Sequence, residues 1–556
     1  MTNRPGRAPI DSLEHLHTDR ENEGAGIVGR IFSQNGCAAL LLVLAVLVTV
    51  AVRVRLAQTP LERDEGEYAY AGQLMLQGIA PYKLAFNMKL PGTYAGYAAI
   101  MALFGETTEG IHLGFLAVNL ATVVLLFFVA RRLLDGPHAL LACACYALLS
   151  ISPGVLGLAG HATHLVTLAA LGGVLLLLKG GESARARTFW CSGLLFGLAF
   201  LCKQPGLFFG MFGAAVMLRD ACESPRSERW IWARNFAWFS LGGALPFLVT
   251  CCLIWRAGTF HRFWFWTVVY ARVHANLLPW GMAREALANF YMRAGVMRWT
   301  WLAAAAGLLC LLASEAPRRA KFLIVCLLGF SLLAFAASFY FSRHYFIVVL
   351  PVLSLLIAIA VRSAARRFGG AISMACFAAA CGLFVFANRA VWFELNPPEV
   401  CRSLYGGNPF PEAVEIAKYI RENSAPGATI AVLGSEPEIY FYAGRHSASG
   451  YIYMYEMMQN HPNASAMQRE MIHDIEEAKP EFLVWVHVPS SWTVWRDSDL
   501  TLIKWSEGYE QRFYDVVGAA CIWSDHPTEY FWGPEAAARE NGTMSRVLVL
   551  RRKPGL

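Results

Sequence analysis

Residues 36–57 read GCAALLLVLAVLVTVAVRVRLA, an apolar run of the length that crosses a bilayer as a single helix. The chain has 556 residues, of which 56% are hydrophobic and 16% are charged, and its mean hydropathy is +0.41. This composition excludes a water-soluble enzyme and a disordered chain. Further apolar runs occupy residues 110–130, 137–157, 163–178, 188–202, 205–218, 236–257, 298–314, 321–341, 345–361 and 370–391. We therefore predict a polytopic α-helical membrane protein with about eleven transmembrane helices.

The apolar runs divide the chain into three parts. Residues 1–35 are polar and rich in glycine, which predicts a disordered cytoplasmic N-terminus. Residues 36–391 form the transmembrane domain, and residues 392–556 have the composition of an ordinary polar domain. Within the transmembrane part, the runs 188–202 and 205–218 are short and meet at CKQPG (202–206), which predicts a bent hairpin.

The distribution of lysine and arginine predicts the orientation. With the N-terminus inside, these residues are about three times denser in the inner connections than in the outer ones, as expected for cytoplasmic loops. Eleven crossings then place residues 392–556 outside the cell membrane. The net charge of +7 comes from short basic clusters between apolar runs, so we expect no nucleic-acid partner.

The first outer segment is more than a connector. Residues 59–78 are predicted to form a helix at the membrane surface, with Thr59 as N-cap, Pro60 at the first helical position, Glu62 completing a capping box and Gly78 as the stop. Residues 91–104 form a second apolar helix that is too short to span. Outer juxtamembrane helices are thus expected within residues 59–104.

The tail, residues 392–556, alternates helix and strand patterns. Residues 412–421 have helical periodicity, and residues 428–433, 481–487 and 546–550 have the pattern of buried strands. We predict a small α/β domain outside the membrane. Its two cysteines, Cys401 and Cys521, would pair only in an oxidising compartment, and the sequence leaves this open.

Candidate catalytic acids follow the first apolar run. The stretch RDEGEYAY (63–70), preceded by Glu62, places four carboxylates on one short helix. Glu62 and Glu67 also fit a structural role at a helix N-terminus, where acids gain from the helix dipole. Asp64 and Glu65 fit that role less well. A carboxylate at a membrane face can take a proton from a hydroxyl or hold a divalent metal.

Candidate phosphate-binding cations occur in three outer segments. Lys89 lies in NMKLPG (87–92), Lys203 in LCKQPG (201–206) and Arg343 in SRHYF (342–346). Ionisable groups at membrane depth are costly and indicate function, and arginine can grip a phosphate with two nitrogens. Anchoring of Lys89 to lipid head groups is the alternative.

Histidines form the remaining candidate group. His161 and His164 in GHATH (160–164) share one face of a helix, and His344 and Tyr345 follow Arg343. Histidines of this kind are metal ligands, contacts for an acceptor, or buried structural residues. The predicted topology brings the acids, the cations and these histidines to one membrane face, which indicates a single polar cavity suited to a lipid-linked phosphate.

The sequence resembles the GT-C membrane glycosyltransferases, in the branch of the dolichyl-phosphate-mannose protein mannosyltransferases and the bacterial aminoarabinose lipid A transferase. The resemblance covers most of residues 55–450. It rests on the order and spacing of DEGEYAYAGQ (64–73), GIAPY (78–82), KLP (89–91), GLLFGLAFLCKQPGL (193–207), RHYFIVVLP (343–351) and IAKYIRENSAPGATIAVLG…IYFYAGR (416–445).

This resemblance implies an inverting sugar transfer from a polyprenyl-phosphate donor to a hydroxyl or phosphate acceptor at the outer face of the cell (inner) membrane. It implies Asp64 as the base with Glu65 in support, and it places Lys89, with Lys203 and Arg343, at the carrier phosphate. Membrane lipids and an acceptor glycan, lipid or protein would be the other partners.

Two departures from the family pattern bear on metal binding. Met88 and the segment HATH (161–164) stand where many relatives carry acids. No cofactor is required by this chemistry, a divalent metal is possible, and His161, His164, His344 and Tyr345 are the candidate contacts for acceptor or metal. A lipid-linked glycan ligase and a transporter or flippase are the alternatives, and the chain shows no internal repeat of the kind that many transporters carry.

Overall fold

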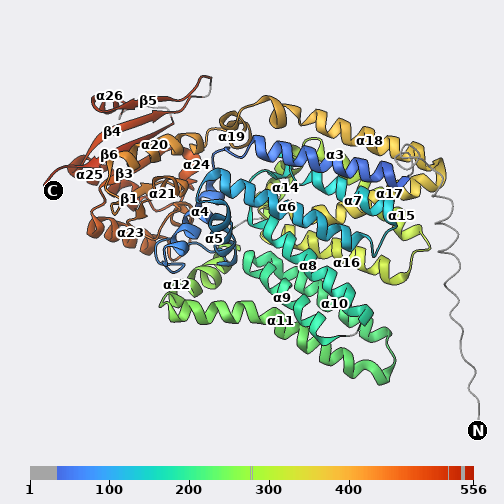
Figure 1. Ribbon diagram of the computed structural model, residues 1–556. Coiled ribbons are helices and arrows are strands. Elements are labelled where there is room, and N and C mark those ends of the chain that lie inside the picture. The colour runs from blue at the N-terminus through green and yellow to red at the C-terminus, as the bar shows by residue number, and fades with distance from the viewer. Residues whose placement is uncertain are drawn as a thin grey trace, which may run out of the picture.

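The computed structural model describes residues 34–183, 185–275, 277, 280–523, 525–539 and 545–555. Residues 1–33 of the predicted disordered segment lie outside these ranges, and residues 34 and 35 already belong to the first helix. Every predicted apolar run overlaps a helix (Figure 1), although the runs 137–157 and 321–341 continue past the ends of their helices at Leu149 and Ala336. These helices are α3 (Gln34–Arg55), α6 (Thr108–Ala130), α7 (Gly136–Leu149), α8 (Ala162–Ser183), α9 (Ala186–Cys202), α10 (Leu207–Glu223), α11 (Arg229–Arg256), α15 (Met297–Ala313), α16 (Arg318–Ala336), α17 (Leu350–Phe368) and α18 (Gly370–Ala387).

Seven of the described helical segments are long and apolar enough to cross a membrane on their own. The helix pair Trp280–Arg293 and Met297–Ala313 passes the same test only together, and it bends by 99°. On α18, the side chains of Ile372, Leu383 and Phe386 are 60–69% exposed. An apolar surface of this kind is stable against lipid and not against water. The chain is therefore an integral membrane protein, while the number of eleven crossings stays a prediction.

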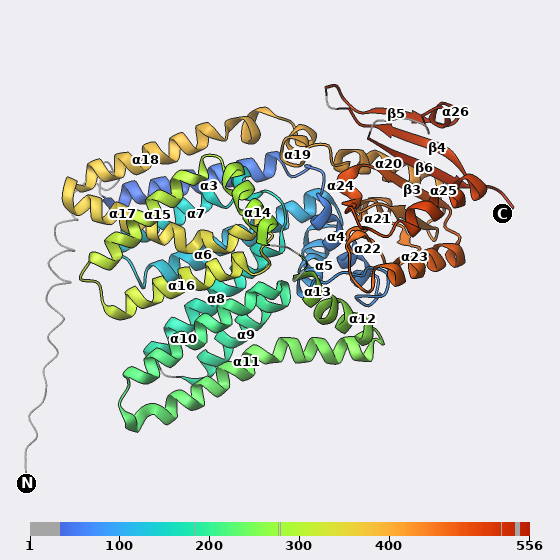
Figure 2. The ribbon, with the colours of Figure 1, turned by 180° about the vertical axis from the view of Figure 1, so that it is seen from behind.

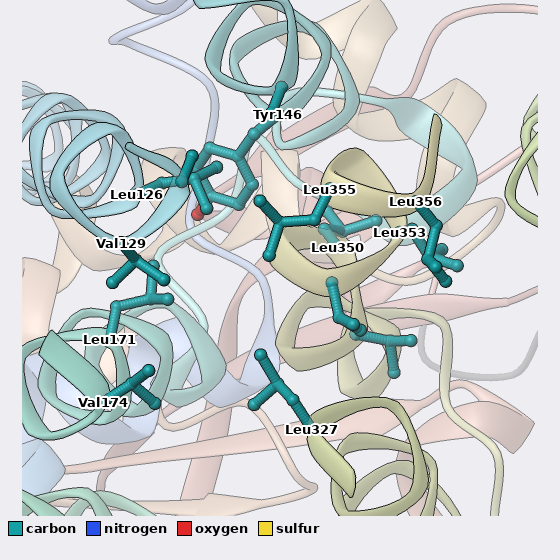
Figure 3. Packing of buried hydrophobic residues seen from close by; sticks show 14 of the residues in the cluster. Leu126, Val129, Tyr146, Leu171, Val174, Leu327, Leu350, Leu353, Leu355 and Leu356 are labelled. Carbon is teal, nitrogen blue, oxygen red and sulfur yellow. The ribbon is translucent and has the colours of Figure 1, made fainter. Parts of the chain in front are cut away.

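The core of the helical region surrounds α17. Leu350 and Leu355 on this helix are fully buried, and they pack in one cluster with Leu126 of α6, Tyr146 of α7 and Leu327 of α16 (Figure 3). Within a bilayer, van der Waals packing of such side chains stabilises the bundle, because lipid tails are as apolar as leucine. This central helix also fixes the segment that precedes it, the short 3₁₀ helix η5 (Arg343–Val349), which carries three predicted site residues.

The outer helices α4 (Arg63–Leu76) and α5 (Gly92–Phe104) lie between the helical bundle and the C-terminal domain (Figures 1 and 2). The predicted cap of the first one is wrong by one turn. Glu62 is the N-cap of a capping box, in which its carboxylate accepts from the Glu65 amide and the Glu65 carboxylate accepts from the Glu62 amide. The segment before it stays extended because Leu61 is buried and its amide donates to the Tyr442 hydroxyl at 2.8 Å. Gly78, with φ of 78°, follows the helix as predicted.

The loop between α11 and α15 joins the membrane region to the C-terminal domain. It contains α12 (Phe260–Trp264), α13 (Ala271–Ala275) and α14 (Trp280–Arg293), with a π-helical segment at Phe265–Tyr270. Phe263, Trp266 and Tyr270 are buried in the same apolar cluster as residues of the C-terminal domain. This loop therefore helps to hold the two regions together.

The C-terminal domain is a six-stranded sheet covered by helices, as predicted for a small α/β domain. The sheet order is β2-β1-β3-β6-β4-β5, with β1 parallel to β2 and β3 and the remaining pairs antiparallel. Its strands are β1 (Thr429–Leu433), β2 (His446–Ser447), β3 (Phe482–His487), β4 (Tyr514–Cys521), β5 (Glu529–Trp532) and β6 (Arg546–Arg552). Its helices are α19 (Pro397–Tyr405), α20 (Phe410–Asn423), α21 (Glu438–Ala443), α22 (Tyr455–Met458), α23 (Ala464–Ala478), α24 (Pro489–Trp492), α25 (Thr501–Phe513) and α26 (Pro534–Ala537).

The helix predicted at 412–421 and the three strands predicted in this domain are confirmed as α20, β1, β3 and β6. Strands β2, β4 and β5 were not predicted. Cys401 and Cys521 are both buried free thiols.

Candidate active site

An ion-pair cluster sits where α4 meets the turn before α5. The Lys89 Nζ atom lies 2.7 Å from Asp64 Oδ1 and 2.5 Å from Glu67 Oε2. Glu67 is fully buried, and its other oxygen accepts a hydrogen bond from the Tyr94 hydroxyl. The Lys89 ammonium also lies 4.7 Å from the centre of the Tyr68 ring. Lysine thus bridges one buried and one partly exposed carboxylate.

Local sequence explains this arrangement. Asp64 and Glu67 are three residues apart on α4, so both side chains lie on one face of the helix. Lys89 comes from the segment NMKLPG, which packs against the segment LCKQPG, because Gln204 Nε2 donates to the Met88 carbonyl at 2.6 Å. Gly92 permits this contact, since a Cβ atom there would lie 2.5 Å from the Leu201 carbonyl.

Lys203, at the end of α9, lies on the same side of the molecule. Its Nζ atom is 3.9 Å from the centre of the Tyr345 ring. Burial lowers the pKa of Lys203 to about 7, with Asp64 raising it and Lys89 lowering it further. Lys203 is therefore a buried cation within electrostatic range of the ion-pair cluster, and its charge changes near neutral pH.

Two histidine rings stack beside Asp64. The rings of His161 and His344 have centroids 3.9 Å apart and planes within 13° of parallel. His344 Nε2 lies 3.7 Å from Asp64 Oδ2, and His161 Nδ1 lies 3.6 Å from Glu62 Oε1. Both distances are too long for a hydrogen bond. Thr163 Oγ1 donates to the His344 carbonyl at 3.0 Å and so ties the start of α8 to η5.

The Asp64–His161–His344 group is the set of described residues whose geometry could hold a metal ion. One ligand atom from each residue lies within 4.8 Å of the other two. Burial lowers the pKa of His161 to about 4, although Asp64 and Glu65 raise it, so this imidazole is neutral near pH 7. A neutral imidazole is the form that binds a metal.

The carboxylates of the cluster differ in charge state. Burial disfavours the charged form of Asp64, but Lys89 and then the neighbouring His344, His161 and Lys203 outweigh it and hold the pKa of Asp64 well below its usual range. Burial, together with the charges of Asp64 and Glu65, raises the pKa of Glu62 well above its usual range. At neutral pH Asp64 is thus the ionised and accessible acid, with 24% of its side chain exposed.

Glu65, predicted to support Asp64, has a different environment. Its side chain is 2% exposed and lies 3.1 Å from His112 Nε2, and one of its oxygens accepts a hydrogen bond from the Gly160 amide. Its carboxylate also caps α4 through the Glu62 amide. Glu65 therefore fixes the orientation of α4 against α6 and the 157–161 turn. Both of its carboxylate oxygens already have partners within the protein.

Two other predicted residues have contacts outside the cluster. His164 Nε2 lies 3.1 Å from the Gly157 carbonyl, which the Arg53 guanidinium also contacts. Arg343 donates to the carbonyls of Leu404 and Pro153. The structure therefore brings together Asp64, Lys89, Lys203, His161, His344 and Tyr345, and the contacts of His164 and Arg343 are with backbone carbonyls.

Two contributors to the cluster were not predicted. Glu67 is one of the four carboxylates of the 62–67 stretch but not among the predicted site residues, although its spacing from Asp64 indicates a shared helix face. Tyr453 comes from the C-terminal domain, with its ring centre 5.5 Å from Lys89 Nζ and its hydroxyl donating to the Arg63 carbonyl at 3.0 Å. No sequence signal relates Tyr453 to a residue so distant in the chain.

Comparisons with known proteins identify a related family and similar folds. Residues 91–271 match the model of the dolichyl-phosphate-mannose-protein mannosyltransferase family. The undecaprenyl phosphate-alpha-4-amino-4-deoxy-L-arabinose arabinosyl transferase of Pseudomonas paraeruginosa is 29% identical over 221 residues, and that of Pseudomonas aeruginosa strain PAO1 is 28% identical. The match covers 36% of this chain and spans 38% of the length of each of these relatives.

Two solved structures share the fold. The aminoarabinose transferase ArnT from Cupriavidus metallidurans, bound to undecaprenyl phosphate, superposes with a TM-score of 0.55 at 16% identity, over 93% of this chain and 98% of that chain. The oligosaccharyltransferase AglB from Archaeoglobus fulgidus gives a TM-score of 0.51 at 13% identity, over 91% of this chain and 75% of that chain. The chain is thus related to the dolichyl-phosphate-mannose-protein mannosyltransferases and has the fold of the GT-C membrane glycosyltransferases.

Proposed function

We propose that this protein is an inverting glycosyltransferase that moves a sugar from a polyprenyl-phosphate donor to an acceptor hydroxyl at the outer face of the inner membrane. One observation carries the proposal. A partly exposed, ionised Asp64 lies against the cation Lys89, with Lys203 close by, at the end of a bundle of apolar helices. This is the combination that a lipid-linked phosphate and an attacking hydroxyl require.

The proposed reaction is one displacement. The acceptor oxygen attacks the anomeric carbon, the bond between that carbon and the phosphate oxygen breaks, and the lipid phosphate leaves with the electron pair. Asp64 takes the proton of the acceptor hydroxyl. Lys89 and Lys203 stabilise the negative charge that grows on the leaving phosphate. Because the attack comes from the face opposite the leaving group, the anomeric configuration inverts.

The ion pair between Lys89 and Asp64 suggests how donor binding prepares the base. Without a donor, Lys89 keeps the pKa of Asp64 low, so the carboxylate is ionised but weakly basic. A donor phosphate competes for Lys89, and movement of the ammonium toward it removes part of this effect. The basicity of Asp64 then rises when the donor is in place, which favours proton transfer from the acceptor.

The comparisons suggest which donor to examine first. The relatives from Pseudomonas are named for transfer of aminoarabinose from undecaprenyl phosphate, and the ArnT structure holds undecaprenyl phosphate. Undecaprenyl phosphate is therefore the carrier of first choice, with aminoarabinose and neutral hexoses as the sugars to compare. The predicted orientation, with the N-terminus inside, places the Asp64 cluster and the C-terminal domain at the outer face.

A donor panel tests this proposal. Purified full-length protein receives polyprenyl phosphate carrying aminoarabinose, mannose, glucose or galactose, with and without candidate acceptors such as lipid A, and release of free polyprenyl phosphate is measured. We expect turnover of one donor, with the sugar recovered in the opposite anomeric configuration.

The alternative classes give different results in the same assay. Turnover restricted to diphosphate-linked oligosaccharides would identify a lipid-linked glycan ligase, a class to which the oligosaccharyltransferase with the same fold gives some weight. Movement of an intact lipid-linked sugar between the leaflets of a vesicle, without release of polyprenyl phosphate, would identify a flippase. Either result would overturn the proposed function.

A further inference from the structure

A groove of about 980 Å³ opens in the C-terminal domain between α19, the start of α20 and the connection from β4 to β5. We propose that this groove is a binding site for a carbohydrate chain that is neutral or carries amino groups. Among the described residues that line it, none belongs to the Asp64 cluster. Binding in this groove is a property of the C-terminal domain and does not depend on the transfer reaction.

A buried carboxylate lines the groove. Glu412 is 1% exposed, and its Oε1 atom accepts hydrogen bonds from Arg402 Nη2 at 2.5 Å and from the Thr528 hydroxyl. Among the described residues, its Oε2 atom has no hydrogen-bond partner. Buried acceptors in proteins normally have one. Because Glu412 lines the groove, a hydroxyl group of a ligand bound there can supply the missing donor.

Aromatic rings also line the groove. The rings of Trp523 and His526 stack, with centroids 4.7 Å apart and planes 27° apart. Trp523 and Tyr530 are half-buried, and His526 is exposed. The face of an aromatic ring is electron-rich, so it attracts the polarised C–H groups on the face of a sugar ring. The groove thus offers flat apolar surface beside hydrogen-bonding groups, which is the combination that a sugar requires.

The charges in the groove disfavour an anionic ligand. Three carboxylates line it against one guanidinium, namely Glu399, Glu412 and Asp525 against Arg402. The guanidinium is already paired with Glu412, so a phosphate or an acidic chain would meet net negative charge. Each sugar hydroxyl is both a donor and an acceptor, and it can pair with the carboxylates and with the guanidinium. Amino groups on the sugar gain further from the negative charge.

The groove is connected to the start of α4. Arg402 Nη1 donates to the Asn408 carbonyl at 3.0 Å, and the side-chain oxygen of Asn408 accepts from Arg63 Nη2 at 3.2 Å. Arg63 directly precedes Asp64. Helix α19 lies where the helical bundle meets the C-terminal domain (Figures 1 and 2). This placement, which here rests on the proposed transferase function, assigns the groove to the carbohydrate part of a glycosylated acceptor.

Direct binding tests the groove without a sugar donor. Full-length protein is purified in a detergent that has no sugar head group, and saturation-transfer NMR measures binding of mannotetraose, maltotetraose and the tetramer of glucosamine. Tetragalacturonate serves as the acidic sugar and tetralysine as the cationic non-sugar. We expect a dissociation constant in the millimolar range or below for one or more of the first three. Tetragalacturonate and tetralysine should bind about tenfold more weakly or not at all.

Variants locate the bound chain. Trp523→Ala removes an aromatic face from the groove, and Glu412→Gln keeps the size of the side chain but removes its charge. Each should weaken binding of the tetrasaccharide about tenfold. Trp505→Ala is the matched control, because Trp505 is a half-buried tryptophan on α25 of the same domain that does not line the groove. Asp64→Asn should bind as wild type does. Thermal unfolding confirms that each variant is folded.

Four results would overturn the groove as a carbohydrate site. These are no binding of the neutral and amino tetrasaccharides by folded wild type, equal affinity in wild type and Trp523→Ala, tighter binding of tetralysine, and loss of binding in Asp64→Asn. Failure of the proposed function is distinguishable from them. Protein that binds a tetrasaccharide through Trp523 but releases no polyprenyl phosphate would leave the groove in place and remove its assignment to an acceptor.

Discussion

The Lys89 ammonium lies 2.7 Å from Asp64 Oδ1, and these residues are 25 positions apart in the sequence. Glu67, one turn along α4, forms a second salt bridge with the same ammonium. The lysine is thus positioned by a buried carboxylate while it neutralises an accessible one. This relationship makes the cluster responsive to an incoming phosphate.

Glu67 should act on Lys89 and not on substrate directly. Glu67→Gln preserves the size of the side chain and its contact with the Tyr94 hydroxyl. It leaves Asp64 as the sole carboxylate of the cluster within salt-bridge distance of Lys89. We expect Lys89 to stay on Asp64 when the donor binds, so that kcat falls about tenfold, equivalent to about 1.4 kcal/mol, with little change in KM. Steady-state kinetics with varied donor concentration measures kcat and KM separately.

Tyr94→Phe provides the comparison for Glu67→Gln. It removes one hydrogen bond to Glu67 and leaves all charges in place. Its effect on kcat should therefore be smaller than that of Glu67→Gln. An equal or larger loss in Tyr94→Phe would contradict a charge-based role for Glu67.

Glu65 should contribute stability and not chemistry. Glu65→Gln weakens the contact with His112 and places an NH₂ group where the Gly160 amide or the Glu62 amide donates. Loss of buried hydrogen bonds to a charged group costs about 1–3 kcal/mol, so the unfolding temperature should fall. Turnover per folded molecule should stay within about threefold of wild type. Normal thermal stability combined with lost turnover would assign Glu65 to catalysis.

Donor binding should weaken as the pH rises through neutrality. Burial lowers the pKa of Lys203 to about 7, so Lys203 is mostly charged at pH 6 and mostly neutral at pH 8. A neutral amine does not attract the donor phosphate, and KM for the donor should therefore rise several-fold between these values. The arginine in Lys203→Arg stays charged between pH 6 and pH 8, so the KM of this variant for the donor should depend less on pH. Identical slopes for wild type and Lys203→Arg would exclude Lys203 as the titrating group.

The close packing at Gly92 offers a structural test. A Cβ atom at this position meets the Leu201 carbonyl at 2.5 Å, so Gly92→Ala must push apart the segments that carry Lys89 and Lys203. Overpacking of this kind typically costs about 1–3 kcal/mol, and both thermal stability and donor affinity should fall. Gly281→Ala is the control, since nothing lies within 4 Å of its Cβ position on α14. An unchanged Gly92→Ala protein would refute the packing of these two segments.

Much of the membrane fold follows from local pattern. Apolar runs of sufficient length predict helices directly, and every predicted run overlaps a helix in the structure. The sequence predicts the start of α4 one turn too early because threonine is a preferred N-cap residue and glutamate is not. The observed start depends on the distant Tyr442, whose hydroxyl accepts the Leu61 amide. Strand β2 has two residues and carries no periodic signal.

The site was only partly predictable. Hydropathy and charge placed Asp64, Lys89, Lys203, His161 and His344 at one face, and the structure brings them together. Apart from the family resemblance, the sequence could not distinguish Asp64 from Glu65, because their difference lies in the tertiary contacts of Glu65 with His112 and Gly160. The role of Tyr453 depends on docking of the C-terminal domain, which no local pattern encodes.

The most direct measurement of the central proposal compares wild type and Asp64→Asn for release of polyprenyl phosphate from the accepted donor in the presence of acceptor. The amide is close in size to the carboxylate but cannot take a proton. We expect turnover to fall by about 10²–10⁴-fold, the range of general-base contributions, with thermal stability retained. Turnover by Asp64→Asn at the wild-type rate would show that Asp64 is not the base and would contradict the proposed mechanism.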